Sequence, residues 1–216
     1  MTTDSDDLDE LLALAKSGDQ AAMAALFDQY RKRLRQMVRL RLDRRLQGRV
    51  DPSDVLQEAY LDASQKLPAY SAKDDLPFFL WLRLVVGQKL IDLHRHHLGV
   101  QMRDAGRDVS IYNGPMPEAT SFALAAQLLG KMTTPSRAAI RTESKLRIQD
   151  ALNAMDPIDR EVLTLRHFEM LTNAETAQVL ELSHAAASNR YVRALKRMKQ
   201  ILDQARSEDS NADRPK

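Results

Sequence analysis

Three of the five histidines lie within the stretch IDLHRHHLG, and their spacing is the first sign of chemistry in this sequence. Histidines can bind a transition metal, and on a polar helix face they can also contact nucleic acid. If the stretch is helical, His94 and His97 share one side, His96 points elsewhere, and the other two histidines lie far along the chain. Because zinc needs three or four converging ligands, the pattern favours a polar, anion-contacting face over a metal site.

These histidines fall near the end of a helix expected from Pro77 to Leu98. Its apolar stripe is expected to comprise Leu82, Val86, Leu90 and Leu93. Another side carries Gln88, Asp92, Arg95 and His96. The groups that suit phosphates or unstacked bases are Lys89, His94, Arg95 and His96. The aromatic residues near the start of the helix can stack on bases, but at this spacing we assign them to the core. They are Phe78, Phe79 and Trp81.

Other chemistry is hard to find in the sequence. There is no cysteine, which excludes thiolate nucleophiles, disulfides and cysteine-ligated zinc. We find no pairing of nucleophile and base, no phosphate-binding glycine loop and no carboxylate cluster, so we expect neither an enzyme nor a cofactor. The net charge is only +2, yet nine Lys and Arg residues against one acid lie between Arg31 and Arg49. Such a block suggests a polyanionic partner, and a solvated helix face is the alternative.

Apolar residues recur at spacings of three and four almost throughout, which predicts an all-α protein. We expect helices at 8–16, 19–45, 53–67, 77–98, 142–155, 158–168, 172–180 and 184–205. The pattern fails between them at YNGPMPEATS and TTPS, which indicates a linker between two small helical domains. No apolar run is long enough to span a membrane and the N-terminus is acidic, so we expect a cytoplasmic protein.

Two helices near the C-terminus are predicted to form a helix-turn-helix. Thr172 and Glu175 have capping-box spacing, Ser183 can cap the next helix, and Ala177 is small where two helices cross. A buried stripe is expected from Leu180, Leu182, Ala187, Val192 and Leu195. The second helix begins with short polar residues suited to base edges, and its cations follow without an intervening acid. The base-reading group is His184, Ser188 and Asn189, and the phosphate-contacting group is Arg190, Arg193, Lys196 and Arg197. A plain α-helical hairpin with solvated charges is the alternative.

A third pattern lies on the helix expected at 53–67. Asp54, Gln57 and Glu58 share one exposed face, and that face suits an arginine-rich partner. An ordinary solvated face is the alternative. The residues expected to pack inward are Val55, Leu56, Ala59 and Leu61.

The stretch NAETAQVLELSHAAASNRYVRALKRMK resembles the promoter-reading helix-turn-helix of bacterial sigma factors. The matching positions are Glu175, Ala177, Leu180, Leu182, Ser183, Arg190, Arg193 and Ala194. Upstream, DVLQEAYLDA resembles the segment with which the sigma-70 family grips RNA polymerase, and FFLWLRLVVGQKLIDLHRHH is similar to the helix that recognises and opens the minus-ten element. The order of the two modules, with little else in the chain, is similar to the extracytoplasmic-function (ECF) group.

This resemblance implies a sigma factor that binds core RNA polymerase, recognises minus-ten and minus-35 elements and helps open promoter DNA. It implies a region 2-like domain at 8–100, a linker at 101–141, a region 4-like domain at 142–205 and a flexible tail at 206–216. Polymerase binding would fall to Asp54, Gln57 and Glu58, and minus-35 binding to the two groups on the second C-terminal helix. The implied minus-ten residues are Gln88, Lys89, Asp92, His94, Arg95 and His96. Besides polymerase and promoter DNA, an inhibitory regulator such as an anti-sigma factor is a candidate partner.

Three positions depart from the family pattern. Glu181 stands where the turn usually has glycine, so the turn must avoid a left-handed conformation or accept strain. Ala186 replaces a common threonine, and Gln88 replaces a frequent asparagine.

Two other functions remain open on the sequence, a stand-alone helix-turn-helix repressor or activator and an α-helical adaptor without a nucleic-acid role. The linker also has two interpretations. Its apolar segment FALAAQLLG can fold back and mask a binding surface, or the linker is a plain tether that lets two weak readers act together.

Overall fold

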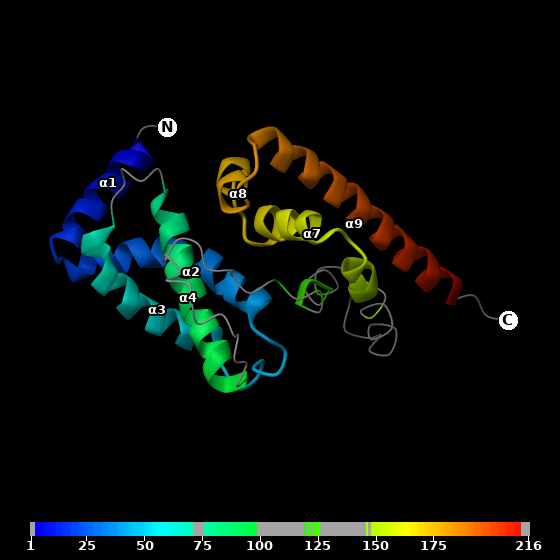
Figure 1. Ribbon diagram of the computed structural model, residues 1–216, viewed down its shortest axis with the longest axis horizontal. Helices are drawn as coiled ribbons and strands as arrows, with labels where there is room; N and C mark the ends of the chain where they lie inside the picture. The colour runs from blue at the N-terminus through cyan, green and yellow to red at the C-terminus, as the bar shows by residue number, and fades with distance from the viewer. Residues whose placement is uncertain are drawn as a thin grey trace, which may run out of the picture. The chain divides into compact units, whose positions relative to one another are not determined.

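The computed structural model (Figure 1) describes residues 3–70, 76–98, 119, 121, 123–125, 146 and 148–212. All regular elements in these ranges are helices, which confirms the predicted all-α class. No helix within them is long and apolar enough to cross a membrane. The chain divides into two compact units, Met1–Pro117 and Glu118–Lys216.

The first unit is built around α2 (Gln20–Arg41), which packs against α1 (Thr3–Lys16), α3 (Pro52–Lys66) and α4 (Phe78–Leu98). Gly18, with φ 100°, makes the tight turn between α1 and α2, and the Asp19 carboxylate caps α2 by accepting from the backbone N–H groups of Ala21 and Ala22. Asp51 caps α3 in the same way, with Pro52 in the first turn, where it costs no hydrogen bond. A short 3₁₀ turn, η1 (Leu67–Ala69), follows α3.

Aromatic side chains fill the core at the start of α4. Phe78, Phe79 and Trp81 are all buried, so their assignment to the core is confirmed. The Trp81 ring lies 5.5 Å from Phe78 and 5.1 Å from Tyr70, centroid to centroid. Further along α4, Leu82, Val86 and Leu90 are buried as expected and Leu93 is half-buried.

Much of the basic block 31–49 is tied to its own domain. Arg41 is buried, the Arg33 guanidinium stacks 3.6 Å from the Phe79 ring centroid, and Arg31 pairs with Asp28 at 2.7 Å. Helix α2 ends at Arg41 instead of continuing to Arg45, because Leu42 takes an extended conformation and is buried. Only the exposed residues of the block, such as Lys32, Arg39 and Arg49, therefore remain candidates for contact with a polyanion.

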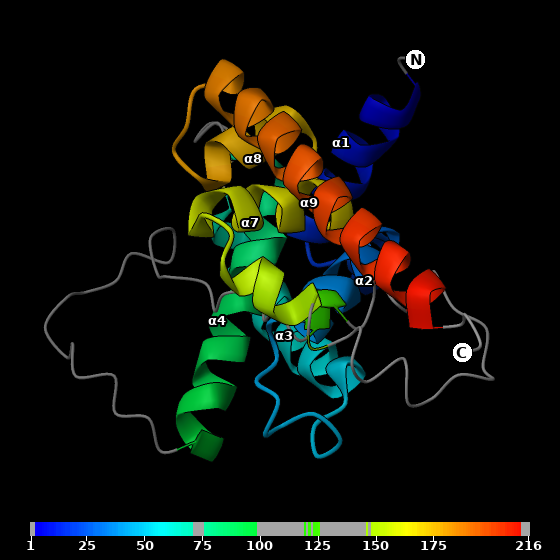
Figure 2. The same ribbon diagram turned by 90° about the vertical axis from the view of Figure 1, so that its right-hand side faces the viewer.

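In the second unit, α9 (His184–Ala212) packs against α7 (Pro157–Leu163) and α8 (Asn173–Val179), and it extends well beyond both toward the C-terminus (Figures 1 and 2). The Asp156 carboxylate caps α7 by accepting from the N–H groups of Ile158 and Asp159. The helix predicted at 158–168 is α7 followed by one π-helical turn, η3 (Thr164–Phe168), in which Phe168 and Leu165 are buried. The capping box of Thr172 and Glu175 is present as predicted.

The buried stripe of α9 differs from the predicted one. Val192 is 48% exposed and Leu195 is 36% exposed, whereas Ala187, Ala194 and Met198 are buried. Alanines permit the close approach of neighbouring helices, and that approach places the larger apolar residues outside. Helix α9 also continues to Ala212, seven residues into the segment expected to be a flexible tail, because no proline interrupts it before Pro215.

The predicted linker, 101–141, lies outside the described residues apart from Ala119, Ser121 and 123–125. Leu124 and Ala125 are fully buried. The other apolar members of FALAAQLLG, which include Phe122, Leu128 and Leu129, are outside the described residues, so both interpretations of the linker stay predictions.

Glu181, at the turn between α8 and α9, takes the left-handed conformation with φ 53°. A residue with a Cβ is strained there, and glycine is not. We expect Glu181→Gly to raise the free energy of unfolding by about 0.5–1 kcal/mol, measured by thermal denaturation followed by circular dichroism. Glu181→Ala is the control, because alanine removes the long side chain but keeps the Cβ. An equal gain in both variants would place the effect in the Glu181 side chain and not in the backbone.

Candidate functional site

Helix α3 presents an exposed polar face. Asp54, Gln57 and Glu58 are all exposed, while Val55, Leu56 and Ala59 are buried as predicted. Leu61 was expected to pack inward, but it is 57% exposed. It lies three residues after Glu58 and seven after Asp54, which places it on the same face. The face therefore combines acid, amide and apolar groups.

Helix α4 packs against α3, and Lys89 joins the two helices. Its Nζ lies 3.2 Å from Asp62 Oδ2 and 3.5 Å from Glu58 Oε2. Partial burial alone lowers the pKa of Lys89, but the hydrogen bond and charge of Asp62 and the charge of Glu58 outweigh it, so the pKa is raised. Lys89 was expected to meet DNA. The structure gives it two carboxylate partners within its own domain.

Beyond Lys89, the polar side of α4 carries a short chain of contacts. Gln88 Nε2 donates to Asp92 Oδ1 at 3.0 Å, and Arg95 Nη1 lies 3.9 Å from the same oxygen. Asp92, Arg95 and His96 are exposed, so this part of the predicted face is open to a ligand.

His94 departs from the expected polar side. Its ring is half-buried, and Nε2 accepts a hydrogen bond from the backbone N–H of Asp43 at 3.2 Å. That nitrogen must be unprotonated to accept, so the neutral ring anchors α4 to the loop after α2. Burial lowers the pKa of His94; the Asp43 carboxylate opposes this shift and the Arg45 charge adds to it. No group of three or more His, Asp or Glu in the described part of the chain can hold a metal ion.

The His94 contact predicts a pH dependence for the first unit. Because the folded-state pKa of His94 lies below its ordinary value of about 6.5, the unfolded chain takes up the proton first as the pH falls. Stability should therefore decrease on acidification from pH 7.5 to 5.5. Urea unfolding followed by the fluorescence of Trp81, the one tryptophan, measures this change. His94→Gln keeps an acceptor that does not titrate, so the pH dependence should be smaller in that variant; an unchanged dependence would contradict the role given to His94.

The residues of α9 that the sequence assigns to a DNA-reading face lie on its exposed side. His184, Ser188 and Asn189 are exposed in its first turns, and the Asn173 side chain secures the start of the helix by donating to the backbone carbonyl of His184 at 2.8 Å. The cations further along are also exposed: Lys196, Arg197 and Lys199. Val192, which the sequence placed in the core, lies among these groups on the exposed side.

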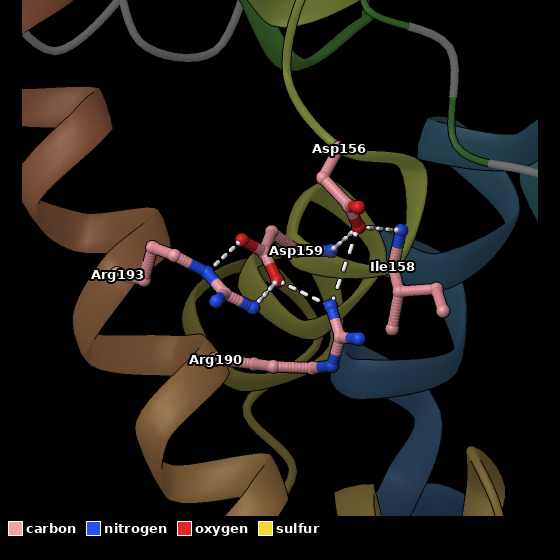
Figure 3. A network of polar contacts seen from close by, with 5 residues as sticks. All are labelled: Asp156, Ile158, Asp159, Arg190 and Arg193. Carbon is pink, nitrogen blue, oxygen red and sulfur yellow. Dashed lines mark hydrogen bonds and ion pairs between the residues drawn. The ribbon is translucent and has the colours of Figure 1, made fainter.

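Arg190 and Arg193 have a different environment from the other cations of α9. Both bind the carboxylate of Asp159 on α7 (Figure 3). Arg190 Nη1 lies 2.7 Å from Oδ1, and Arg193 binds side-on, with Nε 2.5 Å from Oδ2 and Nη2 2.9 Å from Oδ1. The hydrogen bonds from Arg193, and then the one from Arg190, lower the pKa of Asp159 against the opposing effect of burial. The acid thus stays charged and holds α9 against α7.

Sequence reasoning did not single out Asp159 or Asp62. Asp159 is 31 residues from Arg190 and 34 from Arg193, and no local pattern predicts a contact across such a separation. Leu61 was missed because apolar residues on a helix were assumed to face the core.

Residues 145–198, which contain the Asp159 cluster, the capping box and most of the reading face, match the family model of sigma-70, region 4. Over 199 residues, 92% of this chain and 85% of the relative, the sequence is 28% identical to the ECF RNA polymerase sigma factor SigD of Mycobacterium tuberculosis. The chain belongs to the sigma-70 family, in its ECF group.

Further relatives agree with this assignment. The sigma factor is 24% identical over 207 residues to the ECF RNA polymerase sigma factor BldN of Streptomyces coelicolor, covering 94% of this chain and 69% of BldN. A solved structure of CnrH in complex with the cytosolic domain of CnrY superposes with a TM-score of 0.53 at 25% identity, covering 90% of this chain and 96% of CnrH.

SigD and BldN are RNA polymerase sigma factors by name, and sigma factors as a class regulate transcription. The region 4 match lies entirely within the second unit. The matches to SigD and BldN extend over more than nine-tenths of the chain, so they include the α3 and α4 surfaces as well.

Proposed function

We propose that this sigma factor binds core RNA polymerase through α3 and directs it to promoters by reading a minus-ten element with α4 and a minus-35 element with α9. The observation that carries the proposal is that two separate units each present an exposed helix face. One, on α3, is acidic and amide-bearing; the other, on α9, has polar residues at its start followed by cations. The proposed domains are 8–100 and 142–205, joined by 101–141.

For the polymerase, the proposed contacts are Asp54, Gln57 and Glu58, with Leu61 as an apolar addition. Exposed carboxylates and an amide on one helix face can accept and donate several hydrogen bonds to an arginine-rich helical surface. Lys89 helps to position Glu58 for this contact, because its ion pair with Glu58 holds that carboxylate close to α4.

For the minus-ten element, the proposed direct contacts are the exposed groups Asp92, Arg95 and His96, together with Gln88. A glutamine amide can pair with adenine and a carboxylate can accept from cytosine, while arginine serves a phosphate or a guanine. Lys89 and His94 contribute indirectly by fixing α4 to α3 and to the loop after α2. Because Phe78, Phe79 and Trp81 are buried, capture of unstacked bases would rest on these polar groups.

For the minus-35 element, the proposed base-reading residues are His184, Ser188 and Asn189, and Lys196 and Arg197 contact phosphates. Lys199 joins the phosphate group because it is exposed on the same helix. Arg190 and Arg193, which the sequence assigned to phosphate contact, both pair with Asp159, and we propose that phosphate binding is not their main role.

An inhibitory protein such as an anti-sigma factor is also a proposed partner. CnrH, the structural relative, was solved with the cytosolic domain of CnrY bound to it. An inhibitor that covers the α3 face would block polymerase access directly. Since the other proposed partners are polymerase and promoter DNA, we propose the cytoplasm as the site of action.

A binding experiment separates this function from that of a stand-alone repressor. The full-length protein is mixed with core polymerase and with a library of duplex DNA, alone and together. We expect a stable complex with core polymerase and sequence-specific DNA binding that depends on the polymerase. Selection of a palindromic DNA site by the protein alone, with no affinity for polymerase, would support a repressor instead. An adaptor without a nucleic-acid role would show no salt-dependent DNA binding.

A further inference from the structure

The Asp159 carboxylate sits inside the second unit, with a side chain only 6% exposed, and it faces two arginines on α9. We propose that Asp159 is a positioning residue that presents Arg193 to a guanine of the promoter, so that Arg193 reads a base and is not a phosphate contact. This inference rests on the proposed minus-35 function of α9.

Arg193 binds Asp159 with one edge of its guanidinium group, and the N–H donors of a second edge remain available for a ligand. A guanidinium is planar and carries five N–H groups. Arg193 uses the edge formed by Nε and Nη2 for Asp159, so the edge formed by Nη1 and the second hydrogen of Nη2 stays available (Figure 3). Nη1 has no partner in the described part of the chain. Two parallel donors of this kind match O6 and N7 of guanine in the major groove.

Exposure separates Arg193 from Arg190. The Arg193 side chain is 62% exposed, although the acid that holds it is buried. Arg190 is 26% exposed, and its Nη1 contacts both Asp159 and, at 3.4 Å, Asp156, so it is less available to a ligand than Arg193. Arg193 follows Asn189 by one helical turn, which places it beside the proposed base-reading residues.

Charge favours base reading over phosphate binding at this position. The cluster contains Asp156, Asp159, Arg190 and Arg193, so two carboxylates offset two guanidinium groups and the net charge is zero. Its attraction for the phosphate backbone is therefore weak compared with that of the exposed lysines further along α9. Because the cluster is neutral, Arg193 should recognise DNA through the direction of its hydrogen bonds to a base and not through attraction to phosphate.

The contact with Asp159 also fixes the Arg193 side chain before DNA binds. An arginine side chain has many rotamers, and ordering it on binding reduces affinity. The bidentate contact with Asp159 already restricts Arg193 in the free protein. The fork can then meet a guanine without a further loss of side-chain freedom.

The test uses the full-length protein with core polymerase on a promoter that it initiates from, together with duplexes carrying each single base substitution across the minus-35 element. The wild type should discriminate against replacement of one guanine by about 5- to 150-fold, the range expected for a bidentate pair. Arg193→Lys should lose most of that discrimination at that base pair and keep it elsewhere. Lysine keeps the positive charge, so the salt slope is tested with Arg193→Gln, which removes the charge. This variant should show the same loss at that base pair with little change in the salt slope.

Asp159→Asn should weaken discrimination at the same base pair, and Asp159→Asn combined with Arg193→Lys should be no worse there than Arg193→Lys alone. A merely structural role for Asp159 would not act at one base pair. Lys196→Gln is the matched control, because loss of a phosphate contact should lower the binding of all duplexes alike and reduce the salt slope by about 0.9. Circular dichroism checks the fold, and Arg193→Lys decides alone if Asp159→Asn does not fold, because Arg190 still pairs with Asp159 in that variant.

Equal losses of Arg193→Gln on every duplex, with a salt slope reduced by about 0.9, would overturn the inference and leave the proposed function standing. Absence of any sequence preference in the wild-type complex would overturn both.

Discussion

Simultaneous replacement of Asp54, Gln57 and Glu58 by alanine is expected to lower the affinity for core polymerase by about 100-fold or more. Loss of even one hydrogen-bonded charge at a protein interface costs about 2–5 kcal/mol, and about 3 kcal/mol corresponds to this factor. Titration of labelled core polymerase with the full-length variant measures the change.

The fold should survive this substitution. All three side chains are exposed on α3, and alanine has the highest helix propensity. Lys89 loses Glu58 but keeps Asp62 at 3.2 Å. Circular dichroism and the salt-dependent, non-specific binding of DNA by the free protein provide the check.

A matched control lies on α1. Asp7, Asp9 and Glu10 are also exposed helical acids, and their replacement by alanine removes one charge more than the α3 variant does. We expect this control to bind polymerase like the wild type. If both triple variants bind equally well, the α3 face is an ordinary solvated surface.

The second large effect is expected from the exposed cations of α9. Replacing Lys196, Arg197 and Lys199 together with glutamine should reduce the slope of log affinity against log salt by about 2.7, since each phosphate contact contributes about 0.9. Near 0.15 M salt this corresponds to a loss on the order of 100-fold, equal on cognate and random DNA. Binding isotherms at four or five salt concentrations measure both quantities.

Replacing Ser188 and Asn189 with alanine should have the opposite signature. The salt slope should stay the same, while preference changes at one or two base pairs by about 1–3 kcal/mol. The results for the cation variant and for the Ser188 and Asn189 variant together identify which residues of α9 read bases. Equal losses on cognate and random DNA in both variants would contradict the division of roles.

Features set by near neighbours in the chain could be predicted well. The capping box of Thr172 and Glu175, the apolar stripe of α4 and the exposed face of Asp54 follow from spacings of three or four residues. The helix class follows from the same periodicity. At Glu181 the sequence left two outcomes open, a turn that avoids the left-handed conformation or one that accepts strain, and the φ of 53° shows the left-handed conformation.

Features that depend on contacts across the fold could not be predicted. His94 meets a backbone group 51 residues away, and Asp159 meets arginines more than 30 residues away. On α9, hydrophobicity favoured Val192 and Leu195 as core residues, yet the close packing of neighbouring helices selects alanines instead. For Arg190, Arg193 and Lys89 the residue type was read correctly as cationic, but the carboxylates that hold them come from other helices.

We propose that this ECF sigma factor supplies promoter specificity to core polymerase. Run-off transcription with purified core polymerase on a library of genomic fragments, followed by mapping of the start sites, tests it most directly. We predict defined start sites only when the protein is present, preceded by shared sequence elements near minus-ten and minus-35, and loss of these transcripts with the α3 triple variant. Transcripts that are the same with and without the protein would contradict the account.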